Sequence, residues 1–183
     1  KQREQRQDDL EKPICLLDPT CGSGTFLAFG MANGMQVEGC DCKPKCTEGT
    51  LLNLQYLFGE GIVAESSVNI YHHDSSTNWK ETSTVVDCVV ANLPWGINSE
   101  DSGENVCIIQ SIRQRLAKCT PCAFISKESG LELFQETGFQ VLGQAHLPQR
   151  DFRLPKGKKN IKGAVDEKRN GRSSCIITIV LSE

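Results

Sequence analysis

The sequence predicts an α/β protein built on one doubly wound, mostly parallel sheet of seven strands. Two observations lead to this prediction. Short apolar runs typical of buried strands alternate with helical patterns along most of the chain, and the last two runs follow each other without a helix between them. A helix between two strands returns the chain to the same end of the sheet, so the alternating strands are expected to be parallel and their crossovers right-handed. The last strand is expected to insert antiparallel at its edge of the sheet.

Each element is assigned from its apolar pattern and from the residues at its ends. The first strand ends at Asp18 before Pro19, and the helix after it ends at Gly34. Pro44 lies in the first turn of the longest helix, and Gly59 lies just past its end. Strands are expected over 14–18, 36–41, 68–72, 85–91, 122–126, 140–147 and 174–181. Helices are expected over 23–33, 44–58, 105–118 and 128–137.

Length and composition favour one globular domain with a sizeable core. The chain has 183 residues, of which 38% are hydrophobic and 23% are charged. We expect the domain to span residues 13–183, preceded by a charged tail, 1–12, that is the remnant of a longer chain. No stretch approaches the ~20 apolar residues of a membrane span, and the tail lacks the apolar core of a secretory signal. An intracellular, cytoplasmic protein without membrane contact is therefore expected.

The net charge of -3 hides an asymmetry. Nine Lys or Arg residues lie within 148–173 against three acidic residues, so this segment carries +6 and the remainder of the chain -9. The segment joins the last two expected strands. Either it binds a nucleic-acid backbone, because phosphate contacts supply most sequence-independent affinity, or it is a solvated loop. The candidate phosphate-binding residues are Arg150, Arg153, Lys156, Lys158 and Lys159.

Ten cysteines are many for a chain of this length. Half of them lie in apolar runs expected to be buried strands, where cysteine behaves as a small hydrophobic residue. The alternatives are redox pairs or a zinc site, but the spacing of the cysteines at 40, 42 and 46 is not a common zinc-ligand pattern. We therefore predict no metal. The cysteines expected in strands are Cys15, Cys40, Cys88, Cys122 and Cys175.

The loop after the first strand predicts a ligand site, because ligands of open α/β sheets bind beyond the carboxyl ends of the strands. Residues 18–25 read Asp-Pro-Thr-Cys-Gly-Ser-Gly-Thr and open a helix. Gly22 and Gly24 allow a tight turn and a close approach of a ligand, and the helix N-terminus presents N–H groups to a carboxylate. The third glycine of a dinucleotide fingerprint is lacking, which argues against NAD. A purely structural turn is the alternative.

Two more strand ends carry acids on the same edge of the expected sheet. Asp41 follows the glycines by about twenty residues, where an acid can accept hydrogen bonds from ribose hydroxyls, although a solvated Asp is commonplace there. Asp74, followed by Ser75, can accept from an adenine amino group. His72 and His73 suggest metal or base chemistry, but adjacent side chains on an extended segment point to opposite sides.

Residues 92–96, Asn-Leu-Pro-Trp-Gly, follow the fourth expected strand and are the most informative stretch. Trp95 can stack on a flat ring, which is worth ~1–3 kcal/mol at base-stacking sites. The Asn92 side chain and the Leu93 carbonyl can accept hydrogen bonds from an amino group. The alternative is a turn that ends the strand and carries a surface Trp. The segment predicts a pocket for a base with an exocyclic amine.

In these motifs the chain resembles the class I S-adenosylmethionine-dependent methyltransferases that share an Asn-Pro-Pro-Tyr type motif. It most resembles the catalytic domains of the THUMP-associated tRNA and rRNA guanosine-N2 methyltransferases, over residues 14–147 and including Pro44 and Asn53 after the second strand. The resemblance implies a Rossmann-like class I fold and S-adenosyl-L-methionine as cofactor. The residues that it implies for cofactor binding are Asp18, Pro19, Cys21, Gly22, Ser23, Gly24, Thr25, Asp41, Asp74, Ser75 and Asn92. Those that it implies for catalysis are Asn92, Leu93, Pro94 and Trp95.

The chain departs from the family pattern at several of these positions. Leu93 stands where many members have Pro, although only its backbone carbonyl is needed. Trp95 replaces Tyr or Phe and keeps the stacking face. Cys42 and Lys43 replace the usual aliphatic and acidic or polar residues after the ribose acid. No THUMP domain precedes the motifs, so the resemblance implies that an RNA-capturing domain of this kind is lacking or belongs to a longer protein.

The function that the resemblance implies is methyl transfer to the exocyclic amino nitrogen of a base, most specifically guanosine N2 in tRNA or rRNA. Its expected partner is RNA. Gly96 and the Pro44 and Asn53 pattern favour RNA guanosine by resemblance. Three alternatives stay open: a DNA adenine-N6 methyltransferase, a protein-glutamine methyltransferase, and a non-catalytic methyltransferase-like partner subunit.

Overall fold

The computed structural model describes residues 12–65, 68–79, 85–94, 103–127, 131–147 and 175–183. Its strands are β1 (Cys15–Asp18), β2 (Gln36–Asp41), β3 (Val68–His72), β4 (Cys88–Asn92), β5 (Pro121–Lys127), β6 (Phe139–Leu147) and β7 (Cys175–Ser182). Its helices are α2 (Thr25–Ala32), α3 (Pro44–Phe58), α4 (Glu60–Glu65), α5 (Gly103–Arg115) and α6 (Leu131–Glu136).

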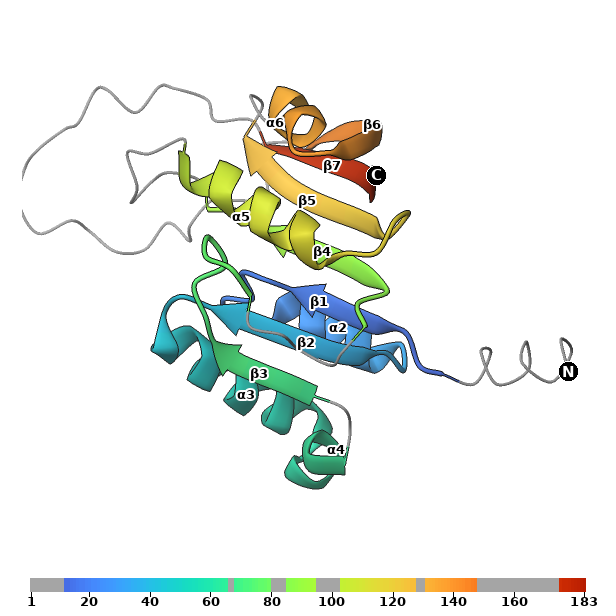
Figure 1. Ribbon diagram of the computed structural model, residues 1–183. Coiled ribbons are helices and arrows are strands. Elements are labelled where there is room, and N and C mark those ends of the chain that lie inside the picture. Colours follow the sequence, from blue (N-terminus) through green and yellow to red (C-terminus); the bar gives the residue numbers. More distant parts are fainter. Residues whose placement is uncertain (1–11, 66–67, 80–84, 95–102, 128–130, 148–174) are drawn as a thin grey trace, which may run out of the picture.

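The strands form one seven-stranded sheet in the order β3-β2-β1-β4-β5-β7-β6 (Figure 1). The first five strands pair in parallel, whereas β7 runs antiparallel between β5 and β6. This topology confirms the predicted doubly wound sheet and its antiparallel last strand. The chain moves outward from β1 to β3 and then returns to the other side of β1, so the switch point lies between β1 and β4.

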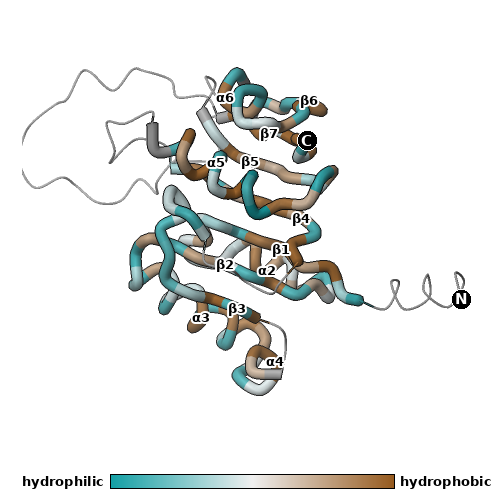
Figure 2. Tube along the Cα trace, viewed as in Figure 1, coloured by the Kyte–Doolittle hydropathy of each residue, from teal (hydrophilic) through white to brown (hydrophobic). Residues whose placement is uncertain are grey.

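Both faces of the central strands are buried. Leu16 of β1 packs with Leu27 of α2 and Leu54 of α3 on one face of the sheet. Its neighbour Leu17 points to the other face and packs with Ile109 of α5, because successive side chains of a strand alternate. The apolar colour follows β1 and β4 through the middle of the molecule in Figure 2. The sheet is therefore the central layer, with helices on both sides.

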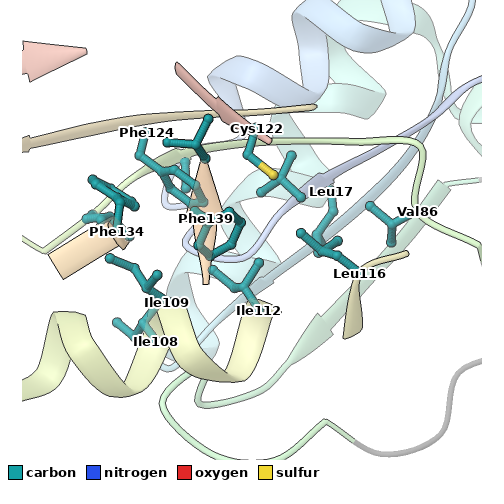
Figure 3. Packing of buried hydrophobic residues seen from close by; sticks show 14 residues of the cluster. Leu17, Val86, Ile108, Ile109, Ile112, Leu116, Cys122, Phe124, Phe134 and Phe139 are labelled. Atoms are coloured by element: carbon teal, nitrogen blue, oxygen red, sulfur yellow. The ribbon is translucent and has the colours of Figure 1, made fainter. Parts of the chain in front are cut away.

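The larger cluster of buried side chains lies on the α5 side of the sheet. Phe134 of α6 stacks on Phe124 of β5 with 5.0 Å between ring centroids, and Phe139 meets both rings edge-on. Figure 3 shows these rings next to Ile109 and Ile112 of α5. This cluster holds β4 and β5 against α5, and it thereby fixes the strand end that carries the acceptor segment, residues 92–94.

The structure corrects the predicted elements chiefly at their ends. α2 begins at Thr25 and not at 23, because Gly24 has a positive φ of 83° and stays in the loop. β4 begins at Cys88 and not at 85. α5 ends at Arg115 and not at 118. The short helix α4 was not predicted, because six residues that include Gly61 give too little pattern.

The cysteine prediction is confirmed at three of the four strand positions whose side chains the structure describes. Cys15, Cys40 and Cys122 are buried, and Cys88 is half-buried. The side chain of Cys175 lies outside the described residues. Within the described ranges, no three His, Cys, Asp or Glu side chains come close enough to hold a metal ion. Within the same ranges, no helix is both long and apolar enough to cross a membrane.

Candidate functional site

The carboxyl ends of β1, β2 and β4 bring the predicted site residues together at one edge of the sheet. Two hydrogen bonds join the loop after β1 to its neighbours. Gly22 N–H donates to Asp41 Oδ2 at the end of β2, over 3.0 Å. Thr20 Oγ1 donates to the Asn92 carbonyl at the end of β4, over 3.1 Å. The glycine loop, 18–25, therefore lies at the switch point between β1 and β4.

The loop has the tight turn that its glycines predict. Gly22 and Gly24 have φ of 54° and 83°, in the left-handed region that favours glycine. Cys21 N–H donates to the Cys40 carbonyl over 2.9 Å, and Gly24 N–H donates to the Cys21 carbonyl over 2.7 Å. The Cys21 side chain is buried, so it packs inside the protein and supports the loop. The chain leaves the turn directly into α2, whose N-terminal amides attract a negative group.

Two side chains of α3 donate hydrogen bonds to carbonyl groups of this loop. Thr50 Oγ1 donates to the Gly22 carbonyl over 3.0 Å, and Asn53 Nδ2 donates to the Ser23 carbonyl over 2.9 Å. A Cβ on Gly24 would lie 2.7 Å from the Thr50 methyl group, so the close approach of α3 also requires glycine at this position. Sequence analysis missed Thr50 and gave Asn53 no role. Their spacing of three along one helix face was the available signal.

Asp41 is fixed by two backbone donors. Its Oδ2 accepts from Gly22 N–H, and its Oδ1 accepts from Lys43 N–H over 2.9 Å. A carboxylate has about four acceptor positions, so these two backbone bonds leave room for a hydroxyl group of a ligand. This arrangement suits the predicted contact with a ribose.

Asp18 is buried beneath the loop, where its Oδ1 accepts the Thr20 N–H over 3.1 Å. Burial raises the pKa of this carboxyl to about 7, the Thr20 hydrogen bond opposes the rise, and the charge of Asp41 adds to it. A cationic group of a ligand close to Asp18 would lower this pKa and favour the carboxylate.

The turn after β3 carries Asp74 and Ser75. Ser76 donates to Asp74 Oδ1 through its N–H over 2.9 Å and through its hydroxyl over 2.6 Å, and these bonds lower the pKa of Asp74. The Ser75 side chain is buried and donates to the Pro19 carbonyl over 2.5 Å. Asp74 is therefore an ionised acceptor at the edge of the site, whereas the Ser75 hydroxyl supports the loop.

His72 and His73 point to different surroundings, as the extended backbone requires. His72 Nε2 lies 3.0 Å from the Cys42 carbonyl at the end of β2. The His73 ring packs against Trp79 with 4.5 Å between centroids. Both histidines therefore make contacts within the protein that support the fold.

The acceptor segment leaves the sheet at the end of β4. Asn92 is exposed there, whereas Leu93 is fully buried and donates its N–H to the Ile125 carbonyl over 3.0 Å. The Pro94 carbonyl accepts from Asn105 Nδ2 over 3.0 Å, a contact that sequence analysis did not foresee. Trp95 and Gly96 lie outside the described residues, and so do Arg150, Arg153, Lys156, Lys158 and Lys159.

The chain is similar to curated proteins, among them the following two, over about half of its length. A protein of Methanothermococcus thermolithotrophicus named "Probable tRNA (guanine(10)-N2)-dimethyltransferase" is 35% identical over 96 residues, which are 51% of this chain and 58% of the relative. The tRNA (guanine(10)-N2)-dimethyltransferase of Methanocaldococcus jannaschii is 29% identical over 98 residues, which are 53% of this chain and 28% of that protein. The match spans less than two thirds of either relative. No protein-family model matches the chain.

Solved structures share the fold at low sequence identity. TrmN of Thermus thermophilus is 14% identical with a TM-score of 0.65, over 100% of this chain and 48% of that chain. The magnesium protoporphyrin IX methyltransferase of Synechocystis PCC 6803, with bound SAM, is 12% identical with a TM-score of 0.63, over 99% of this chain and 76% of that chain. The cyclase SpnF is 14% identical with a TM-score of 0.67, over 99% and 81%. The chain thus has the Rossmann-like class I methyltransferase fold. Because a cyclase shares this fold, the reaction has to be argued from the site.

Proposed function

We propose that this chain is the catalytic domain of an S-adenosyl-L-methionine-dependent methyltransferase that acts on the exocyclic amino nitrogen of a base in RNA. The specific methyl acceptor that we propose is guanine N2 in tRNA. The observation that carries the proposal is the hydrogen bond between Thr20 and Asn92, which puts the glycine loop and the acceptor segment side by side. The names of the partial relatives support the RNA substrate and the guanine target.

The donors and acceptors of the site suit this cofactor. Asp41 keeps acceptor positions for ribose hydroxyls, and Asp74 is an ionised acceptor for an adenine amino group. The amides of the glycine loop and of α2 attract a carboxylate. An ammonium group near Asp18 would lower the pKa of this carboxyl and favour its charged form. When bound, the cofactor supplies an electrophilic methyl group on a sulfonium. These residues would hold it at the carboxyl ends of β1, β2 and β3.

The acceptor segment would orient the base amine. An exocyclic amine is a weak nucleophile because its lone pair is delocalised into the ring. We infer that Asn92 and the Leu93 carbonyl accept its two hydrogens and leave the lone pair directed at the methyl group. No strong base is needed before attack, and much of the rate comes from positioning and electrostatics.

RNA binding would rest on two parts of the chain outside the described residues. The target base has to be unstacked or single-stranded to enter such a pocket, and Trp95 would stack on it. The basic segment, residues 148–173, would bind phosphates. A separate RNA-capturing domain such as THUMP stays a prediction for the full-length protein.

The proposal is tested by incubating the protein with cofactor labelled on its methyl group and with separate tRNA, rRNA, DNA and protein substrates. Mass spectrometry of the digested products then identifies the modified unit. N2-methylguanosine from tRNA is the expected product. Label in N6-methyladenine of DNA or in glutamine of protein would replace the proposed substrate with that alternative. Cofactor binding without label in any substrate would favour a non-catalytic subunit.

A further inference from the structure

Asn105 lies in the first turn of α5, outside every motif that the sequence analysis singled out. Its Nδ2 donates to the Pro94 carbonyl over 3.0 Å. The Oδ1 atom of the same amide is buried and has no hydrogen-bond partner among the residues that the structure describes. Asn105 thus holds the acceptor segment from a rigid helix, with the donor end of its amide.

The anchor at Pro94 acts together with one at Leu93. The Leu93 N–H donates to the Ile125 carbonyl of β5, and the Leu93 side chain is fully buried. Proline has no N–H, so the carbonyl is the backbone group through which Pro94 can be held. The peptide between these two anchors carries the Leu93 carbonyl, which is one of the two proposed acceptors of the base amine.

Helix stability does not account for an Asn at this position. In the first turn of a helix an Asp is favourable because of the helix dipole, and a buried acceptor without a partner is costly. Asn has the same shape as Asp but carries an N–H donor where Asp has a second oxygen. That donor is the atom that meets Pro94.

We propose that Asn105 is a positioning residue for the methyl acceptor. By holding the Pro94 carbonyl, it fixes the direction of the Leu93 carbonyl toward the amine that receives the methyl group. This inference rests on the proposed function, since it assigns Asn105 to the acceptor half of that site. Among the described residues no hydrogen bond joins Asn105 to Asp41 or Asp74, so cofactor affinity should not depend on it.

The decisive variant is Asn105→Asp, which keeps the shape and the acceptor oxygen, suits the helix terminus and removes the donor. Its matched control is Gln110→Glu, which changes an exposed amide of α5 into an acid. We expect Asn105→Asp to lower kcat on an unmodified tRNA transcript about 10-fold or more, because small displacements of reacting groups are costly. The Kd for S-adenosyl-L-methionine should match that of the control, because Asn105 is assigned to the acceptor half of the site. A kcat equal to that of Gln110→Glu would overturn the proposal.

A second measurement is independent of activity. Hydrogen exchange of the Leu93 amide should be several-fold faster in Asn105→Asp than in the wild type, because the segment has lost one of its anchors. Gln110→Glu should leave it unchanged. If the wild type methylates no nucleic acid, the proposed function fails, but the exchange rate still decides whether Asn105 anchors the segment. Unchanged exchange at Leu93 would overturn the role of Asn105 whatever the substrate.

Discussion

Arg115 at the end of α5 forms a buried ion pair with Glu38 in the middle of β2, with 2.7 Å between Arg115 Nη2 and Glu38 Oε2. The Tyr71 hydroxyl donates to the other carboxylate oxygen over 2.6 Å. The guanidinium also lies 4.7 Å from the centre of the Trp79 ring, in cation–π contact. This network ties α5 and β2 to the segment after β3, which carries Asp74.

Removal of one partner of this pair should destabilise the fold strongly, because the other charge would stay buried and unpaired. We expect Glu38→Gln or Arg115→Met to lower the free energy of unfolding by about 3–5 kcal/mol in urea titrations. The double variant should lose less than the sum of the two. The exposed Glu48→Gln of α3 is the control and should change little. Additive losses would show that the two side chains do not act as a pair.

Asp18 should make cofactor binding depend on pH. Its pKa is raised to about 7 by burial, so the carboxyl takes up a proton as the pH falls through 7. A cationic cofactor group beside it favours the carboxylate, so we expect the Kd for S-adenosyl-L-methionine to be larger at pH 6 than at pH 8, by up to about 10-fold. Asp18→Asn should flatten this dependence in calorimetric titrations. An unchanged slope in that variant would place the titrating group elsewhere.

The same pKa shift predicts how stability without cofactor depends on pH. The folded pKa of about 7 exceeds the ordinary aspartate pKa of 3.8, so between these values the folded state retains a proton that the unfolded state releases. The contribution of Asp18 to stability is therefore present below pH 3.8 and is lost as the pH rises to about 7. Urea titrations of Asp18→Asn should show a flatter profile than the wild type over this interval.

Gly24 should tolerate alanine less well than another glycine of similar φ. Gly24→Ala would bring a Cβ within 2.7 Å of the Thr50 methyl group, whereas at Gly34, with φ of 74°, a Cβ meets nothing within 4 Å. Gly34→Ala should cost about 1–2 kcal/mol of backbone strain without a change in cofactor affinity. Gly24→Ala should cost more and weaken cofactor binding. Thr50→Ser removes the methyl group, keeps the hydroxyl, and should partly rescue Gly24→Ala.

The fold was predictable because its signals are local. The three residues of β1 before Asp18 are apolar, as a strand buried on both faces must be, and the rule that ligands bind at carboxyl ends of strands located Asp41. Glu38 shows where this reasoning stops. Its place in a central strand implies burial, but its partner Arg115 lies 77 residues away and only the folded chain brings them together.

The candidate site was predictable to the same extent. The residues expected to face the ligand lie in contiguous motifs, whereas those that hold the motifs come from other elements. Thr50 and Asn53 reach the glycine loop from α3, and Asn105 reaches Pro94 from α5. These positions carry ordinary polar residues on helices, and the spacing of Thr50 and Asn53 along one helix face does not by itself separate them from solvated side chains.

Asn92 should be required for methyl transfer and not for the fold. It is exposed at the end of β4, so Asn92→Ala removes its amide at little cost in packing. By comparison with oxyanion-hole donors, we expect kcat to fall about 10²–10³-fold, with cofactor still bound. Gln140→Ala, an exposed amide of β6, is the control. An Asn92→Ala protein that binds cofactor and keeps full turnover would contradict the proposed chemistry.

The basic segment should contribute phosphate contacts to RNA binding. We expect weaker tRNA binding when Gln replaces Lys156, Lys158 and Lys159. The slope of log Kd against log salt should fall by about 2, because a protein with fewer phosphate contacts releases fewer counterions on binding. The control replaces three exposed lysines outside the segment, Lys12, Lys45 and Lys118, with the same change in net charge. Because the net charge of both variants is lower by three, an equal effect on the slope would indicate that net charge alone is responsible. A reduced slope confined to the first variant would locate the phosphate contacts in residues 148–173.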